Sequence, residues 1–478
     1  MTSAAASFRQ KLDHPIVDAD GHIVESLPAL VEMLRKLAGS EVADRFGGAS
    51  KTFASRSASA GAKVSAGGGI PVPGTPIEPW WALPTNTLDR ATGFLPQLLH
   101  ERLDDLGIDF SILYSSVGLA FIGNADDKLR KHGCRAVNLY LNEQLDGLQD
   151  RLTAAAVIPM HTPEEAIEEL EYAVGTLGFR TAMFNSFVER PSPPGGPRSH
   201  YIDVLALDSP YDYDPVWQKC VELGIAVTVH SSSQGIGLRQ SSSRYMFNHI
   251  GNFAASSEAF AKALIFGGVM NRFPTLRVGF LECGVGWGAG LLADLSDRWS
   301  KRGGTNIEAL DPSRIDASKW NELMLKYGRG AFEDPTILRA TGAQSDNPPI
   351  ERDDFRGTGI NDVADIATIF ERFFFGCEAD DSTIPQAYAR QTLPEGIALQ
   401  PILGSDLGHW DVRDMREVIP EAGELLDDGL VSKDDFRRFA CDNPIRLHGG
   451  MNPTFFDGTI VEAYAREVLG AGSLDRSA

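Results

Sequence analysis

The segment EEAIEELEYAVGTLGFRTAMFNS, residues 164–186, combines the two patterns that decide the fold of this chain. Its first part carries apolar residues at the spacing of one helix face and ends at Gly178. Its second part, residues 179–186, is a short apolar run bounded by polar residues, which is typical of a strand. A helix followed directly by a buried strand is the repeating unit of an α/β fold.

The same order of helix and apolar run recurs along the chain. The eight apolar runs are residues 16–22, 108–115, 152–160, 179–186, 225–230, 276–283, 373–377 and 399–406. Several are continuously apolar rather than alternating, which indicates strands that are covered on both faces. Eight such units predict an α/β fold, a (β/α)8 TIM barrel with long loop insertions and a C-terminal helical segment after Asp406. A doubly wound open sheet is the alternative.

Three segments interrupt this repeat. Residues 47–79 are rich in Gly, Ser and Pro and predict an irregular insertion or lid. Residues 187–213 contain PSPPGGP and predict a long loop after the fourth strand, and residues 306–359 predict an insertion between strands six and seven. We expect one domain over residues 1–478, because α/β barrels form one unit and grow by insertion.

The composition excludes several classes of partner. Acidic residues outnumber basic ones 65 to 44, for a net charge of −21, and no basic cluster interrupts this excess, so we expect no nucleic acid or membrane partner. Apolar stretches far shorter than about 18 residues and an N-terminus without a secretory signal predict a cytoplasmic protein. The five cysteines form no C-x-x-C pair and predict buried small apolar residues rather than a disulfide framework.

The first apolar run, IVDADGH at residues 16–22, ends in a row of polar side chains. Alternation along a strand predicts that Asp18, Asp20 and His22 project to one side. Carboxylates and an imidazole at a strand end are costly to leave unpaired, and a divalent cation is the simplest partner that satisfies all of them. The alternative interpretation is a polar strand end that caps a turn.

Other predicted strands also end in groups that can bind metals or move protons. In a barrel, catalytic groups stand at the carboxyl ends of strands. These positions hold His230 after strand five, Glu282 after strand six, Glu378 and Asp380 after strand seven, and Asp406 with His409 after strand eight. His230 alone would favour a structural role, but the other strand ends supply partners for a metal site. Asp406 is either a turn residue or the base that deprotonates a water at the metal.

Together these motifs resemble those of a known family. Asp20-Gly21-His22, His230, RFPTLRVGFLECGVGW at residues 272–287 and LGSDLGHW at residues 403–410 resemble the amidohydrolase superfamily. Within it they resemble the amidohydrolase-2 group, which includes aminocarboxymuconate-semialdehyde decarboxylase and related non-oxidative aromatic decarboxylases. The resemblance extends from Ile16 to about His448, without the insertions 47–79 and 306–359.

The resemblance implies a (β/α)8 barrel that holds one divalent metal ion, zinc or manganese. It implies Asp20, His22, His230 and Asp406 as the metal ligands, with Asp406 also handling protons. Asp18 is then left as a structural acid or as a partner of the ligands. Replacing His230 by alanine should abolish metal binding and leave the fold intact.

Two positions depart from the pattern of that group. Asp20 stands where histidine or glutamate is common, which is a mild change because aspartate ligates the same metals. Glu282 stands where the decarboxylases have a histidine, which changes both charge and proton-transfer pKa. Glu282 is a general base, a partner that orients a ligand histidine, or a buried structural acid. With Asp20 and Asp406 also ionised, the site would overcompensate a dication, so we expect the pKa of Glu282 to be raised.

Further candidates lie in the loops near these strand ends. His249 is a catalytic candidate, with the capping of a helix as the alternative, and Arg244 is a candidate for binding a substrate carboxylate or phenolate. His409 and Trp410 follow Asp406 closely enough to line the same mouth and bind substrate. We expect the acidic cluster of Glu378, Asp380 and Asp381 to be a solvated loop. The tryptophan pair Trp80 and Trp81 predicts either an active-site rim or an oligomer interface.

The leading functional hypothesis is a metal-dependent hydrolase. In it a water activated by the metal, and deprotonated by Asp406 or Glu282, attacks a small organic substrate, carboxylated or aromatic. The alternative within the same fold is non-oxidative decarboxylation of an aromatic acid. A third hypothesis is a barrel without catalysis that serves binding or assembly. We expect a small-molecule substrate and a homo-oligomer, whose stoichiometry no sequence pattern fixes.

Overall fold

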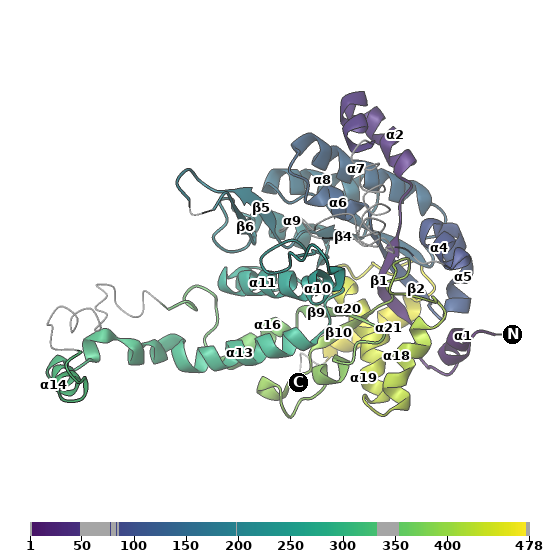
Figure 1. Cartoon of the computed structure of the whole chain (residues 1–478). Coiled ribbons are helices and arrows are strands. Elements are labelled where there is room, and N and C mark those ends of the chain that lie inside the picture. The colour runs from purple at the N-terminus through teal and green to yellow at the C-terminus, as the bar shows by residue number, and fades with distance from the viewer. Residues whose placement is uncertain are drawn as a thin grey trace.

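The computed structural model describes residues 2–47, 77, 83, 86–196, 198–331 and 353–474. Eight parallel strands form a nearly closed barrel with helices packed around it (Figure 1). The strands are β1 (Val17–Ile23), β2 (Phe110–Ser115), β3 (Leu152–Ile158), β4 (Thr181–Phe184), β7 (Val227–Val229), β8 (Val278–Phe280), β9 (Phe373–Glu378) and β10 (Gln400–Gly404). Each of the eight predicted apolar runs overlaps one of these strands, so the barrel prediction is confirmed.

The order of the strands distinguishes a barrel from an open sheet. Neighbours in space follow the order of the chain, β1-β2-β3-β4-β7-β8-β9-β10, without the reversal that a doubly wound sheet requires. Two backbone hydrogen bonds then join the last strand to the first. Asp406 N donates to Asp20 O at 3.0 Å, and His22 N donates to Leu407 O at 3.1 Å. This seam places the ends of β1 and β10 against each other.

The helices cover the outside of the barrel and alternate with its strands. In the first half of the chain they are α1 (Ala4–Arg9), α2 (Leu27–Ala38), α4 (Thr87–Phe94), α5 (Pro96–Leu106), α6 (Gly118–Ile122), α7 (Asp127–Gln144), α8 (Pro163–Gly175) and α9 (Asp214–Leu223). They continue with α10 (Tyr245–His249), α11 (Asn252–Phe266), α12 (Val269–Arg272), α13 (Gly286–Arg302), α14 (Ala317–Tyr327), α16 (Val363–Phe370) and α17 (Ile384–Ala387). The predicted C-terminal helical segment consists of α18 (Val418–Asp427), α19 (Lys433–Arg437), α20 (Asn443–Gly449) and α21 (Glu462–Leu474).

Local sequence signals explain how a helix passes into the next strand. Helix α8 begins after Thr162, whose side chain accepts a hydrogen bond from Glu165 N, and Pro163 occupies its first turn. Helices α5 and α9 end at Gly107 and Gly224, with φ of 73° and 67°, a left-handed conformation that glycine adopts without steric cost. Each helix therefore stops at a defined residue, and the chain turns directly into a buried strand.

The segment after β4 differs from its prediction as a long loop. Residues 187–213 contain an antiparallel pair, β5 (Val188–Pro191) with β6 (His200–Asp203). Arg190 on β5 is buried, and its guanidinium pairs with Asp203 on β6 and donates to Tyr213 Oη at 2.9 Å. Pro193, Pro194, Gly195 and Gly196 of PSPPGGP lie in the connection of this hairpin, so this turn signal marks a hairpin inside the predicted long loop.

Two predicted insertions have different outcomes. Most of residues 47–79, together with Trp80 and Trp81, lies outside the described residues. In residues 306–359 the described part contains α14, which together with α13 extends away from the barrel as an arm (Figure 1). In the part of the chain that the structure covers, no helix combines the length and the apolar character that crossing a membrane requires. The five cysteines are free, and all except Cys283 are buried, as predicted.

Candidate metal centre

Five polar side chains from four strand ends meet inside the barrel mouth. Asp20 and His22 come from β1, while His230, Glu282 and Asp406 stand one or two residues beyond β7, β8 and β10. Their side chains are between 0% and 5% exposed. The convergence that the sequence predicts is therefore found, although nothing yet identifies which of these residues bind a metal.

The ligand atoms of these side chains face one another. His22 Nε2 lies 3.6 Å from Asp20 Oδ1 and 3.3 Å from Asp406 Oδ1. His230 Nε2 lies 3.9 Å from Asp20 Oδ1 and 3.2 Å from Glu282 Oε2. In the set Asp20, His22 and His230, every pair of ligand atoms lies within 4.8 Å. These separations suit side chains that surround one ion.

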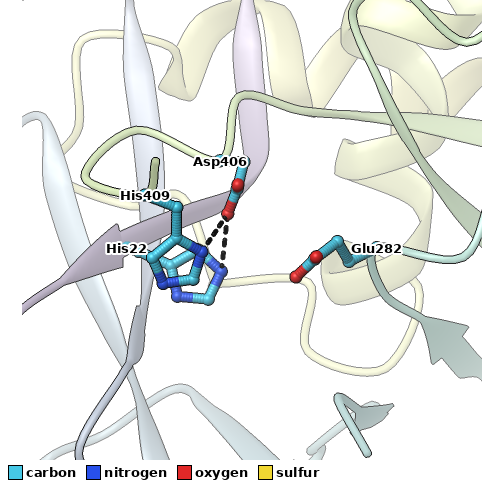
Figure 2. Close-up of side chains that lie close together, drawn as sticks. All are labelled: His22, Glu282, Asp406 and His409. Carbon is cyan, nitrogen blue, oxygen red and sulfur yellow. Dashed lines mark ion pairs between the residues drawn. The ribbon is translucent and has the colours of Figure 1, made fainter. Parts of the chain in front are cut away.

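His409 joins this cluster more closely than its predicted role in substrate binding requires. Its Nδ1 lies 2.6 Å from Asp406 Oδ1, and its ring stacks on that of His22 with centroids 3.9 Å apart (Figure 2). Its Nε2 shares a hydrogen bond with Ser116 Oγ at 3.1 Å. His409 is thus placed to orient Asp406, and it belongs to a second possible ligand set with His22, Glu282 and Asp406.

Several atoms at the centre of the cluster are buried without a hydrogen-bond partner. They are Asp20 Oδ1, His22 Nε2, His230 Nε2, Glu282 Oε2 and both carboxylate oxygens of Asp406, although Asp406 Oδ1 has its close ion-pair contact with His409. Leaving buried polar atoms unpaired is unfavourable, and native proteins rarely do so. Imidazole nitrogen and carboxylate oxygen are ligands of zinc and manganese, so the donor set fits a divalent cation.

The electrostatics of the cluster agree with this interpretation. Burial raises the pKa of Asp20 to about 8, and the nearby charge of Glu282 adds to this effect. Burial also raises the pKa values of Glu282 and Asp406 well above their usual range, and it lowers the pKa of His409 to about 4. The raised pKa expected for Glu282 is therefore found, but Asp20 and Asp406 share it. A bound dication would stabilise the ionised carboxylates.

Backbone geometry distinguishes the two carboxylates that end β8 and β10. Glu282 has φ of 48° and Asp406 has φ of 49°, the left-handed region that non-glycine residues seldom adopt. Such conformations cost about 1–3 kcal/mol and persist where neighbouring structure enforces them, frequently at functional sites. Here Asp406 N donates to Asp20 O, and Cys283 N donates to Gly376 O at 3.1 Å. The strained turns hold both carboxyl groups at the barrel mouth.

Asp18 does not join the cluster. The pairing of β1 with β2 shifts register between Asp18 and Gly21, so the simple alternation predicted for this strand is wrong. The Asp18 carboxylate instead accepts hydrogen bonds from Ser111 Oγ at 2.5 Å and from Ser405 N and Oγ at 2.9 and 2.7 Å. It is a structural acid that ties β1 to its two neighbouring strands, one of the roles expected for it.

A pocket of about 600 Å³ opens above the cluster. Its walls include the aromatic side chains of Phe253, Trp287 and Trp410, together with His249 and the carboxyl group of Glu282. Trp410 and His249 therefore lie where substrate-facing residues were predicted. Phe253 and Trp287 were not predicted, although Trp287 closes the quoted GVGW motif. The pocket offers flat apolar surfaces beside the polar cluster.

Two predictions about the pocket need correction. Arg244 is exposed at the start of α10, its guanidinium donates to Ser243 O, and it is not among the lining residues. Glu378 was expected in a solvated loop, but it lines the pocket, and burial raises its pKa to about 8. Asp381 lines the pocket as well and accepts hydrogen bonds from Thr383, so only Asp380 of that cluster is well exposed.

The sequence is similar to those of characterised decarboxylases. A "Gamma-resorcylate decarboxylase" of Rhizobium sp. (strain MTP-10005) is 26% identical over 223 residues, which are 42% of this chain and 64% of the relative. A protein of the same name from Rhodococcus jostii (strain RHA1) is 27% identical over 157 residues, 32% of this chain and 45% of the relative. The matches thus span between 45% and 64% of the length of these relatives.

Solved structures with some likeness to this chain include amidohydrolases and decarboxylases, two of which follow. A 5-carboxyvanillate decarboxylase from Sphingomonas paucimobilis has 13% identity and a TM-score of 0.47, covering 91% of this chain and 98% of that chain. A dihydroxybenzoic acid decarboxylase from Polaromonas sp. JS666, solved with bound manganese and 2-nitroresorcinol, has 18% identity and a TM-score of 0.44, covering 73% and 84%. The barrel itself is established by the strand order of this chain.

A family model covers the centre of the chain. The model described as amidohydrolase (Amidohydro_2) matches residues 89–310, which include His230 and Glu282 but neither Asp20 nor Asp406. The resemblance noted from the strand-end motifs is confirmed over this part of the chain, since residues 89–310 match the amidohydrolase family model.

Proposed function

We propose that this chain is a metal-dependent decarboxylase that removes the carboxyl group of an aromatic acid without oxidation. The observation that carries the proposal is the buried cluster of unpaired imidazole and carboxyl groups at four strand ends, which adjoins an aromatic-lined pocket through Glu282. The curated relatives support decarboxylation rather than the hydrolysis that the sequence favoured, because two of them are named gamma-resorcylate decarboxylase. Hydrolysis by the same cluster has no support from these relatives.

We assign the metal ion, zinc or manganese, to Asp20, His22, His230 and Asp406. The first three form one compact set, and Asp406 Oδ1 lies 3.3 Å from His22 Nε2, the same nitrogen that faces Asp20. The bound cation would supply positive charge that holds and polarises the oxygens of the substrate. The aromatic walls formed by Trp287, Trp410 and Phe253 would hold the substrate ring by its faces.

The reaction requires one proton. The bond between the ring carbon and the carboxyl carbon breaks, carbon dioxide leaves, and the electron pair that remains on the ring carbon takes up the proton. We assign the handling of this proton to Asp406, because its buried carboxyl group lies between His22 of the cluster and His409. His409, 2.6 Å from Asp406 Oδ1, positions this carboxyl group.

The proposal is tested with the purified protein loaded with manganese or zinc and incubated with 2,6-dihydroxybenzoate and related hydroxybenzoates. We expect release of carbon dioxide and formation of the corresponding phenol. Asp406→Asn should lower kcat by at least about 100-fold at saturating metal, whereas the exposed Asp146→Asn should leave it unchanged. Cleavage of an ester, amide or lactone substrate without carbon dioxide release from any aromatic acid would establish the hydrolase instead.

A further inference from the structure

The pocket above the cluster is acidic. Its lining includes five carboxyl groups, those of Glu282, Glu378, Asp380, Asp381 and Asp411, and none of the lining residues in the described parts of the chain is a lysine or arginine. Burial and neighbouring carboxylates raise the pKa of Glu378 to about 8, which shows how crowded this negative charge is. An aromatic acid would enter as an anion. Positive charge in the pocket, in addition to that of one cation deep in the barrel, would favour the entry of this anion.

One group of side chains in this pocket is arranged to bind a cation that would provide such positive charge. His249 ends α10, Glu282 follows β8, and Asp411 follows β10, and their ligand atoms lie within 4.8 Å of one another. Opposite ligands of a six-coordinate ion with bonds of about 2.1 Å are about 4.2 Å apart, so small side-chain adjustments suffice. This group contains none of the four proposed ligands of the first ion, although Glu282 lies beside His230 and Asp411 beside Asp406.

The bonding state of these residues gives independent support. The Glu282 side chain is 5% exposed, lines the pocket, and its Oε2 has no hydrogen-bond partner. Asp411 Oδ1 is also buried without a hydrogen-bond partner. The His249 ring stands between Trp410, at 5.6 Å, and Phe253, at 6.1 Å, which fixes it as a wall of the same pocket. Two buried oxygens without a hydrogen-bond partner thus converge with an imidazole, and Glu282 Oε2 also lies 3.2 Å from His230 Nε2 of the first cluster.

We propose that His249, Glu282 and Asp411 hold a second divalent cation next to the first, with Glu282 lying between the two ions. Carboxylate oxygen with one imidazole nitrogen is a donor set that manganese, zinc and magnesium accept. The site explains why a glutamate occupies the end of β8, because a histidine there would add no negative charge for a second ion. It deepens the proposed function, since the second cation would attract the anionic substrate, but its existence does not depend on which reaction occurs.

The experiment is a count of bound manganese. Full-length protein stripped of metal is dialysed against a range of Mn²⁺ concentrations. The number of manganese ions per chain is then measured by elemental mass spectrometry. We expect two ions per chain for the unaltered protein and one for Asp411→Asn and for His249→Gln, with two retained in the exposed control Asp146→Asn. Thermal unfolding confirms that each variant is folded, and the conservative His249→Gln is the second probe if Asp411→Asn is unstable.

Electron paramagnetic resonance of the bound Mn²⁺ tests the same site by a second method. Two Mn²⁺ ions that share a carboxylate interact magnetically, so the unaltered protein should show a coupled spectrum that Asp411→Asn converts to that of an isolated ion. One ion per chain at saturation, or two ions retained in both variants, would overturn the second site. These results are separable from the proposed reaction: decarboxylation with a single bound ion refutes only the second site, and two bound ions without decarboxylation refute only the reaction.

Discussion

Asp18 and Asp20 stand two residues apart on β1 and differ in what surrounds their carboxyl groups. Asp18 accepts hydrogen bonds from Ser111 and Ser405, whereas Asp20 Oδ1 has no hydrogen-bond partner and faces two imidazoles. The first carboxyl group therefore stabilises the fold, and the second is stabilised only when a cation is present. Of these two aspartates, one is therefore bonded within the fold, and the other is one of the proposed metal ligands.

This difference predicts that alanine substitutions at the two positions change different properties, the stability of the metal-free protein at one and its stabilisation by metal at the other. Asp18→Ala leaves buried donors of Ser111 and Ser405 unpaired and should lower the free energy of unfolding by about 3 kcal/mol. Asp20→Ala removes a buried, unpaired carboxyl group and should leave the metal-free protein as stable as before, or more stable, while removing its stabilisation by Mn²⁺. Urea unfolding with and without Mn²⁺ measures both, and equal losses of metal-free stability in the two variants would contradict the assignment.

His230 gives a second test at the level of a single residue. His230→Ala should abolish binding of the ion assigned to Asp20, His22 and His230 while the protein stays folded. The exposed His200 on β6 provides the matched control, His200→Ala, which should retain the ion. Metal analysis combined with circular dichroism distinguishes the outcomes, and a full complement of metal in His230→Ala would remove His230 from the ligand set.

The strand-end residues that converge in the cluster were predictable from the sequence, whereas the positions of the loop residues around the pocket were not. Asp20, His22, His230 and Asp406 directly end apolar runs, so the barrel alone brings them together. Arg244 lies in a loop, and its path over the surface depends on contacts that periodicity does not contain. Asp411 was missed for the same reason, although it directly follows the HW pair of the quoted motif.

At the level of elements, the bulge in β1 positions the whole site. The register shift between Asp18 and Gly21 lets Asp18 bond to Ser111 and Ser405 while His22 reaches Asp406. Gly21 is required there, because a Cβ at this position would lie 2.7 Å from both Asp18 Oδ2 and Ser111 Oγ. A sequence pattern does not predict such a bulge, since it depends on residues from strands far away in the chain.

Substitution of Gly21 tests the role of the bulge in β1. Gly21→Ala should push Asp18 and Ser111 apart, lower the free energy of unfolding by about 2 kcal/mol, and weaken metal binding because Asp20 and His22 flank it. The control is Gly175→Ala at the end of α8, where nothing lies within 4 Å of the added Cβ and stability should not fall. Thermal unfolding and metal titration test this, and unchanged metal affinity in a destabilised Gly21→Ala would separate the bulge from the site.

The eight strands were predictable because each is buried on both faces and reads as an apolar run. The hairpin of β5 and β6 was not, since its short strands alternate between buried and exposed residues over only four positions each. The direction of the arm formed by α13 and α14 was also not predictable, because the sequence there shows only helical periodicity. That direction depends on how α13 leaves the barrel (Figure 1).

For the molecule as a whole, the cluster couples metal binding to pH. In the metal-free protein the pKa values of Asp20 and Glu378 are raised to about 8, whereas the unfolded chain loses these protons near pH 4. The folded state therefore binds more protons across this window, and its stability falls as the pH rises through it. Metal binding needs ionised carboxylates, so it strengthens as the pH rises.

We therefore expect Mn²⁺ to raise the Tm more at pH 8 than at pH 6. The metal-free protein should melt at a lower temperature at pH 8, and the loaded protein should regain most of this loss. Scanning fluorimetry with and without Mn²⁺ at the two pH values measures the difference. A Tm increase that is equal at both pH values, or larger at pH 6, would show that the buried carboxyl groups do not bind the ion.

The central claim is that the strand-end cluster uses a divalent cation to decarboxylate an aromatic acid. The most direct measurement follows carbon dioxide from carboxyl-labelled 2,6-dihydroxybenzoate in one preparation of the protein, first as metal-loaded, then after chelation, and finally after Mn²⁺ is restored. We expect labelled carbon dioxide from the metal-loaded protein and from the protein with restored Mn²⁺, and none from the chelated protein. Release that continues after complete removal of metal, or no release from any hydroxybenzoate when the site is filled, would contradict it.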